Sequence, residues 1–165
     1  MKIKELGHVA FKCRNLKESV DFYCGILGLE KKFVMTYGEL ADAMRRRATD
    51  HGYDAPEDDI NHLMQIADRE WFIYLKICER QFLELFEAGE ASELCIPDEK
   101  KFNYQHMALI VEDIYSARKE LEERGVKIDI EVDHSVDGNL GMWIHDPDGN
   151  KIEIIQYTEN SLQFK

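Results

Sequence analysis

The chain has 165 residues with 44% hydrophobic and 33% charged side chains, a composition typical of a globular protein and not of a disordered one. Its formal net charge of −12 argues against a nucleic-acid partner, because phosphate binding needs clustered lysine and arginine. The sequence has no signal-peptide pattern and no apolar run of about 18 residues. Its four cysteines form no C-x-x-C pair, so we expect a cytoplasmic protein with reduced thiols and no membrane contact.

A strand, a helix and a second strand are predicted at the start of the chain. The run ELGHVAFKCRN alternates apolar and polar residues, which favours a strand. Asn15 is followed three residues later by Glu18, the spacing of a capping box that opens a helix. Gly28 is placed to end that helix, and residues 30–35 are expected to form the next strand.

A long segment separates this strand from the next pair of strands. Residues 71–77 and 81–86 resemble a hairpin. Before it, residues 38–50 have helical periodicity, and residues 60–67 suggest a second short helix. We therefore expect a helical insertion at about residues 38–70.

The same order of elements returns in the second half of the chain. The run NYQHMALIVED indicates a strand, Asp113 a helix N-cap, Gly125 the end of that helix, and VKIDIEV the following strand. An offset of 98 residues takes His8 to His106 and Asn15 to Asp113. Repetition of a whole strand–cap–helix–glycine–strand order indicates a duplicated unit.

Each copy ends in a strand with a central glutamate, Glu84 in FLELF and Glu153 in KIEII. A D-P-D-G turn precedes the second of these strands. The spacing from first-strand histidine to glutamate is 76 residues in the first copy and 47 in the second, so the first copy has 29 extra residues. We predict an α+β fold of two βαβββ modules, residues 1–95 and 96–165, with the insertion at about 38–70 in the first.

The matched histidines and glutamates form a candidate metal site. Side chains alternate across a strand, so His8 and His106 lie among apolar neighbours on faces expected to point inward, as do Glu84 and Glu153. A single strand histidine is usually structural, but equivalent positions in both copies favour a ligand set. Two imidazoles and two carboxylates suit zinc, nickel or cobalt, with manganese or iron as alternatives, and not calcium. The other histidines are expected at the surface or beside a ligand: His51, His62, His134 and His145.

The runs GHVAF, NLKESVDFYCGILGLE, FLELF, HMALIVEDI and DPDGNKIEIIQ resemble the glyoxalase/bleomycin-resistance/extradiol-dioxygenase superfamily. The resemblance covers nearly the whole chain except roughly residues 38–70. It implies paired modules that form a curved, partly open barrel around one metal, with ligands His8, Glu84, His106 and Glu153. A homodimer is the common family arrangement, and the site can be built within one chain or shared between two.

The ligand set indicates a branch of this superfamily. A complete His-Glu-His-Glu set is similar to glyoxalase I (lactoylglutathione lyase) and methylmalonyl-CoA epimerase, which move a proton next to a carbonyl. The likeness to glyoxalase I implies that Glu153 is the metal-linked general base and Glu84 its counterpart. Lys12 stands where glyoxalase I has an arginine that holds glutathione, which weakens a glutathione assignment.

We therefore expect a metal-dependent lyase or isomerase acting on a small carbonyl substrate. The alternatives are an epimerase or dioxygenase of the same superfamily, and a bleomycin-resistance-type protein that binds a ligand without catalysis.

Overall fold

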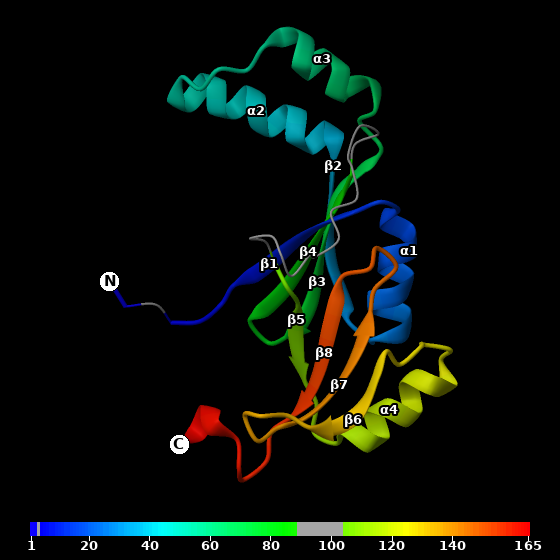
Figure 1. The fold of residues 1–165 in the computed structure, drawn as a ribbon. Helices are drawn as coiled ribbons and strands as arrows, with labels where there is room; N and C mark the ends of the chain where they lie inside the picture. The colour runs from blue at the N-terminus through cyan, green and yellow to red at the C-terminus, as the bar shows by residue number, and fades with distance from the viewer. Residues whose placement is uncertain (3, 89–103) are drawn as a thin grey trace. The chain divides into compact units, whose positions relative to one another are not determined.

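The computed structural model describes residues 1–2, 4–88 and 104–165 and has an α+β fold (Figure 1). The chain divides into two compact units, one made of Met1–Cys24 and Gly28–Ser92, the other of Gly25–Leu27 and Glu93–Lys165. The boundary predicted between residues 95 and 96 lies outside the described residues. Each unit contains one four-stranded mixed sheet with helices, so the predicted fold class is confirmed.

The order of elements is βαβββ in each half, with two extra helices in the first. In chain order the first half contains β1 (His8–Cys13), α1 (Leu16–Val20), the π-helical turn η1 (Asp21–Ile26), β2 (Glu30–Thr36), α2 (Tyr37–His51), α3 (Glu57–Gln65), β3 (Glu70–Cys78) and β4 (Gln81–Glu87). The second half contains β5 (Met107–Ile110), α4 (Ile114–Glu123), β6 (Ile130–His134), β7 (Leu140–His145), β8 (Lys151–Gln156) and the 3-10 turn η2 (Leu162–Phe164). Among the described residues, no helix has the length and apolar composition that a membrane crossing needs.

The two sheets have the same topology. The strand order is β1-β4-β3-β2 in the first and β5-β8-β7-β6 in the second, and neither is closed into a barrel within the described residues. The first strand of each module pairs with the last in parallel, and the other neighbours are antiparallel. The register also repeats, since Ala10 lies opposite Glu84 and Ala108 opposite Glu153. The duplication seen in the sequence is therefore a duplication of structure.

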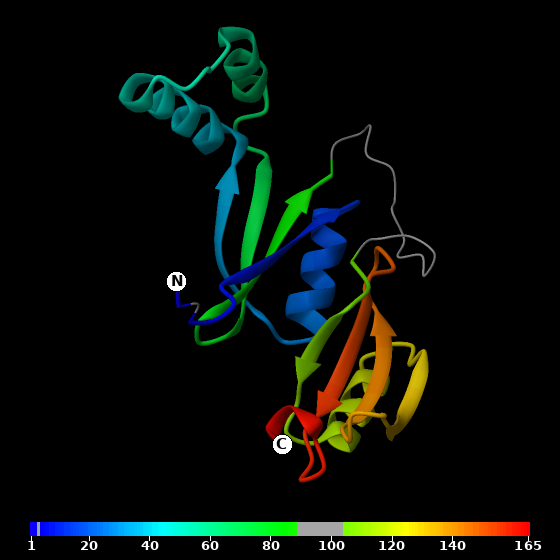
Figure 2. The same cartoon turned by 60° about the vertical axis from the view of Figure 1, so that its left-hand side comes forward.

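One face of each sheet forms the apolar core of its module. Alternate residues of the central strands are fully buried on this face, and α1 and α4 are each packed against strands of their own sheet (Figure 2). Burial of these side chains supplies most of the stabilisation of each module, at about 25 cal/mol per Å² of apolar surface. The central core residues are Ile73, Leu75, Leu83 and Leu85 in the first module, and Met142, Ile144, Ile152 and Ile154 in the second.

The N-terminus of α1 differs in detail from a capping box. The Asn15 side-chain oxygen accepts a hydrogen bond from the Glu18 backbone N–H at 3.2 Å, as expected of an N-cap. The Glu18 carboxylate, however, accepts from the Asn15 side-chain amide at 2.9 Å. The helix continues into η1, and Gly28 follows with φ of +79°, a conformation that glycine adopts without strain.

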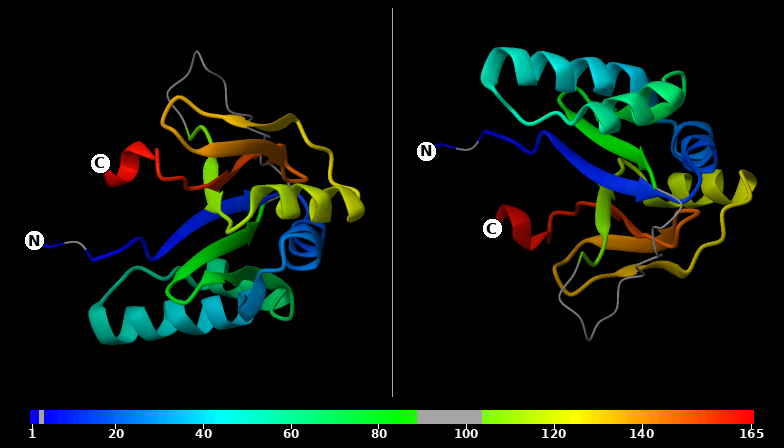
Figure 3. Two further views of the ribbon diagram at one scale, coloured as in Figure 1. Left: turned by 90° about the horizontal axis from the view of Figure 1, so that it is seen from below. Right: turned by 90° about the horizontal axis from the view of Figure 1, so that it is seen from above.

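The insertion leaves the sheet at the end of β2 and returns at the start of β3. Thr36 and Glu39 form a full capping box at the start of α2, and Gly52 ends that helix with φ of +67°. The helices α2 and α3 lie side by side (Figure 3). A Cβ added to Gly38 would lie 3.1 Å from the Ala67 Cβ, so the small side chain permits close packing there.

The D-P-D-G turn before β8 is built around a buried carboxylate. One oxygen of Asp146 accepts hydrogen bonds from the backbone N–H groups of Asp148 at 2.9 Å and Asn150 at 2.8 Å. The other oxygen accepts from the Asn150 side-chain amide at 2.9 Å, and Gly149 has φ of +83°. The predicted turn is present, and it fixes the point at which β8 begins.

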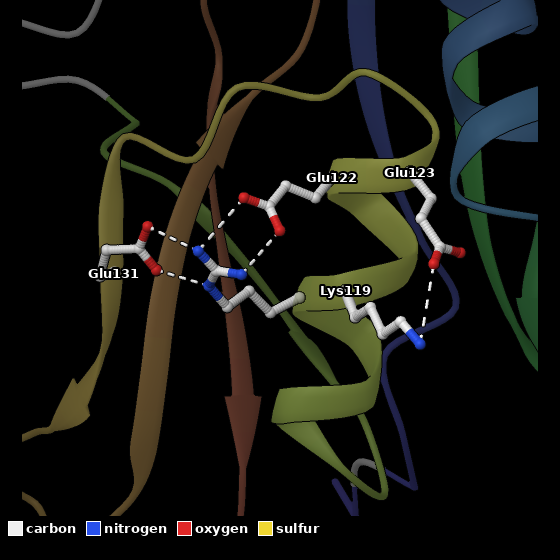
Figure 4. A network of polar contacts seen from close by, with 5 residues as sticks. Lys119, Glu122, Glu123 and Glu131 are labelled. Carbon is white, nitrogen blue, oxygen red and sulfur yellow. Dashed lines mark hydrogen bonds and ion pairs between the residues drawn. The ribbon is translucent and has the colours of Figure 1, made fainter.

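Arg118 of α4 contacts Glu122 of its own helix and Glu131 of β6 (Figure 4). Its guanidinium donates to both oxygens of Glu131, at 2.6 and 3.0 Å, and to both oxygens of Glu122, at 2.8 and 3.3 Å. The hydrogen bonds and charge of Arg118 hold the pKa of Glu131 below its ordinary value. Lys119, one residue further along, has a single contact of 3.8 Å with Glu123.

We expect Arg118→Gln to lower the melting temperature by a few degrees near neutral pH. Lys119→Gln removes the same charge from the same helix and serves as the control. It should change the melting temperature by no more than about one degree. A carboxyl whose folded pKa is depressed contributes stability above its unfolded pKa and loses it as the pH falls through the folded value. The effect of Arg118→Gln should therefore vanish in acid, as followed by thermal melts from pH 7 to pH 3. Equal effects of the two variants would contradict this account of the network.

Candidate metal centre

The first module brings His8 and Glu84 together at one point of its sheet. His8 opens β1, and Glu84 lies in the middle of the neighbouring strand β4, opposite Ala10. The Nε2 atom of His8 is 3.6 Å from the Oε2 atom of Glu84. The side chain of Glu84 is 12% exposed and that of His8 is 49% exposed, so the carboxylate is mostly buried and the imidazole is accessible.

The second module repeats this pair. His106 directly precedes β5, and Glu153 lies in β8 opposite Ala108. The Nε2 atom of His106 is 3.5 Å from the Oε2 atom of Glu153. Glu153 is 19% exposed and His106 is 39% exposed, the same contrast as in the first module.

The spacing within each pair fits two donors on one ion. Ligands at about 2.1 Å from a tetrahedral zinc-like ion lie about 3.4 Å from one another, close to the separations of 3.5 and 3.6 Å found here. Imidazole nitrogen with carboxylate oxygen is also a donor set that such ions accept. Among the described residues, no three His, Cys, Asp or Glu side chains lie together at metal-binding range. Each module therefore brings together one histidine and one glutamate.

The faces that carry these residues are not the faces that form the module cores. In β1 the more buried positions are Val9, Phe11 and Cys13, and His8 is on the opposite, more exposed side. The sequence predicted that the faces of all four residues point inward. Glu84 and Glu153 are mostly buried, whereas the two histidines lie outside the apolar core of their own module. The physical reason is that α1 and α4 pack on the apolar faces of their own sheets, which leaves the faces that carry the histidines more exposed.

Burial perturbs both carboxyl groups. It raises the pKa of Glu84 above its ordinary value, and the neighbouring charge of His8 opposes part of this rise. Burial also raises the pKa of Glu153, opposed by His106 and reinforced by Asp137. A nearby cation would relieve the cost of keeping these carboxylates ionised.

This cost predicts an unusual stability effect in metal-free protein. We expect Glu84→Gln to raise the melting temperature by a few degrees at pH 7, because the amide carries no charge to desolvate. A carboxyl with a raised folded pKa contributes stability below its unfolded pKa and loses it as the pH rises through the folded value, so the difference should disappear near pH 4. Thermal melts with a chelator present measure this, with Glu159→Gln at an exposed position as the control. A lower melting temperature for Glu84→Gln at pH 7 would contradict it.

Two aromatic side chains beside the pairs were not singled out from the sequence. Tyr74 lies opposite Glu84 in the β3–β4 register, and Trp143 lies opposite Glu153 in the β7–β8 register. Each ring contacts the histidine of its module edge-on, with centroids 5.6 Å apart in the first and 4.8 Å in the second. The offset of 69 residues from Glu84 to Glu153 also takes Tyr74 to Trp143, so extending the repeat alignment to the third strand would have found them.

The first module continues this aromatic surface around Glu84. Phe33 stacks on Tyr74 with ring centroids 4.6 Å apart and planes inclined by 15°. Phe72 and Phe82 each lie 5.8 Å from the Tyr74 ring. These aromatic side chains form an aromatic wall next to the His8–Glu84 pair.

The remaining histidines lie elsewhere. His145 is hydrogen-bonded through Nδ1 to Asp129 at 2.6 Å, and this side chain is exposed at the end of β7. An open cavity of about 550 Å³ occurs in the insertion, where its lining residues include Arg47, His51 and Tyr53. Neither His8 nor Glu84 lines this cavity, so it is separate from the first pair.

Residues 5–154 match the family model of the Glyoxalase/Bleomycin resistance protein/Dioxygenase superfamily. The chain belongs to this superfamily, as the resemblance of its sequence motifs led us to expect. No curated protein matches the chain.

Solved structures of this superfamily share the fold at low sequence identity. A superfamily member from Sphaerobacter thermophilus is 21% identical, with a TM-score of 0.60 over 94% of this chain and 98% of that one. A glyoxalase/dioxygenase from Nostoc punctiforme is 22% identical, with a TM-score of 0.60 over 94% of this chain and 92% of that one. Lactoylglutathione lyase from Agrobacterium tumefaciens is 16% identical, with a TM-score of 0.57 over 94% of this chain and 96% of that one.

Proposed function

We propose that the chain is a metal-dependent lyase or isomerase of the glyoxalase I type, acting on a small carbonyl substrate. The observation that carries this proposal is the pair of His–Glu contacts, 3.6 Å in one module and 3.5 Å in the other, at the same point of two sheets with the same register. We propose that His8, Glu84, His106 and Glu153 together bind one ion of zinc, nickel or cobalt, with manganese or iron as alternatives. The two pairs meet either within one chain or between two copies in a homodimer.

When bound, the ion supplies Lewis-acid chemistry, polarising a substrate carbonyl group and stabilising negative charge on its oxygen. The protein must then remove a proton from the adjacent carbon. We assign this step to Glu153, a mostly buried carboxylate whose Oε2 atom lies 3.5 Å from Nε2 of His106, because a carboxylate beside the reacting carbon can accept the proton. The same carboxyl group can return the proton to the neighbouring carbon, so the net reaction moves one hydrogen and needs no oxidant. Glu84 is its counterpart in the first module.

The surroundings of the pairs bear on the substrate. The aromatic wall of Phe33, Phe72 and Tyr74 suits an apolar or planar part of the substrate next to the reacting carbonyl. The net charge of −12 disfavours binding of the phosphates of coenzyme A. These features favour a small carbonyl compound or thiol conjugate over an acyl-CoA.

A screen for proton transfer in deuterium oxide tests the proposal. The protein is loaded with zinc, nickel or cobalt and incubated with hemithioacetals, acyl-CoA thioesters or sugar-derived hydroxycarbonyl compounds, and the products are analysed by mass spectrometry. We expect an isomerised product from one class, with deuterium at the carbon beside the carbonyl in the fraction of turnovers in which the proton on the Glu153 carboxyl group exchanges with solvent before its return.

Other outcomes identify the alternatives. Consumption of dioxygen with a catechol substrate would indicate a dioxygenase of the same superfamily. Tight binding of a ligand that is recovered unchanged, by protein that stays metal-free after supplementation, would indicate a bleomycin-resistance-type function. Either result would overturn the proposed lyase or isomerase activity.

A further inference from the structure

The two His–Glu pairs differ in the aromatic residue that stands over them. Tyr74 and Trp143 occupy equivalent register positions, each opposite the glutamate of its module. The Tyr74 ring meets His8 at an interplanar angle of 61°, and the Trp143 ring meets His106 at 74°. The two rings thus have similar geometry, but their polar groups differ, since Tyr74 carries a hydroxyl group and Trp143 an indole N–H.

Only the tyrosine reaches a nitrogen of its histidine. The Tyr74 hydroxyl lies 3.2 Å from Nδ1 of His8, and the other ring nitrogen, Nε2, is the one that faces Glu84. A hydroxyl can donate or accept, so it serves either tautomer of the imidazole. Within the described residues, Nδ1 of His106 has no such hydrogen bond, and the indole N–H of Trp143 could only donate.

The Tyr74 hydroxyl is itself held in place. Phe33 stacks on the ring at 4.6 Å, and Phe72 and Phe82 flank it. Burial and the charge of Glu84 raise the pKa of Tyr74, so the hydroxyl keeps its proton at neutral pH. An imidazole can carry its proton on either ring nitrogen, and its ring can rotate about the side-chain bonds. A hydrogen bond from a fixed group to one ring nitrogen restricts both the tautomer and the ring orientation.

We propose that Tyr74 is a positioning residue that orients His8 for metal binding, a support that the equivalent residue Trp143 does not give to His106. This inference rests on the proposed metal-binding function. Groups that hydrogen-bond the outer nitrogen of a metal-bound histidine change metal affinity by about 10- to 100-fold. Tyr74 is the described group in contact with Nδ1 of His8.

Tyr74→Phe removes the hydroxyl and keeps the ring that packs on Phe33. We expect its affinity for Zn²⁺, measured by competition with a chromophoric chelator, to fall about 10- to 100-fold. Trp143→Phe keeps an aromatic ring over His106 and should lower the affinity by less than about threefold, because no hydrogen bond to that histidine is lost. Tyr115→Phe, which removes a hydroxyl from an exposed side chain of α4, is the control for the substitution itself.

A second readout needs no metal. In metal-free protein, the Nδ1 nitrogen shift of His8 in imidazole ¹⁵N spectra should move toward the value of a nitrogen without a hydrogen bond in Tyr74→Phe, and the shifts of His106 should stay in place. Wild-type affinity in Tyr74→Phe, equal losses in Tyr74→Phe and Trp143→Phe, or an unmoved His8 shift would each overturn the inference and leave the metal-binding proposal standing. Failure of the wild-type protein to bind Zn²⁺ would overturn both.

Discussion

Glu153→Gln should lower turnover by about 10²- to 10⁴-fold on a substrate found in the deuterium screen, with metal still bound. The amide has nearly the shape of the carboxylate and can still offer an oxygen, but it cannot accept the proton. Glu153 lies 3.5 Å from His106 in a mostly buried position. Steady-state kinetics and metal content should be measured on the same preparation.

Glu84→Gln is the matched control for this result. Glu84 has the same register position, the same kind of histidine contact and the same direction of pKa shift, so the two substitutions perturb equivalent sites. We expect Glu84→Gln to affect turnover less than Glu153→Gln. Full turnover by metal-loaded Glu153→Gln would refute the assignment of the base, and a larger loss in Glu84→Gln would exchange the two roles.

His8→Ala and His106→Ala should each weaken binding of Zn²⁺ by more than about 100-fold, because loss of a ligand exceeds the cost of disturbing groups that only support one. Chelator competition measures the affinity of each variant. His62→Ala, at an exposed position of α3, is the matched control and should bind as the wild type does. A comparison of His8→Ala with His106→Ala tests whether the two modules contribute equally to metal binding.

The pattern of losses distinguishes the possible sites. If only one histidine mattered, the ion would be bound by one module and the four-ligand proposal would be wrong. If neither mattered, the His–Glu contacts at 3.5 and 3.6 Å would be structural ion pairs without a metal role.

The repeat could be predicted because it depends on local signals. The N-caps Asn15 and Asp113 precede α1 and α4, and Gly28 and Gly125 follow these helical segments with positive φ. Apolar alternation indicates the strands between them. The offset of 98 residues then places the two histidines at equivalent points of the two copies.

Other features depended on contacts that the sequence does not display. The run VKIDIEV predicted a strand from Val126, but β6 begins only at Ile130. The Val126 N–H instead bonds the Leu121 carbonyl at 2.9 Å to finish α4, and Asp129 is the first residue of this run to bond β7, through Trp143. Strand β5 likewise begins one residue after His106, which leaves that histidine at the edge of the ladder.

The alternation of side chains along a strand predicted which residues share a face, but it did not predict which face is buried. Both faces of β4 are apolar in composition, since Leu83 and Leu85 alternate with Phe82, Glu84 and Phe86. The packing of α1 determines which face of β4 is buried, and α1 covers the face with Leu83 and Leu85. The contact between the Tyr74 hydroxyl and His8 was missed for a related reason, because it joins residues 66 positions apart in the sequence.

The metal content of the purified protein is the most direct test of the central claim. The protein is incubated with excess Zn²⁺, Ni²⁺ or Co²⁺, desalted, and analysed for metal per chain, alongside the quadruple variant His8→Ala, Glu84→Gln, His106→Ala, Glu153→Gln. We predict one ion per wild-type chain and none in a folded quadruple variant. A wild-type protein that stays free of metal, or a quadruple variant that retains its ion, would contradict the account.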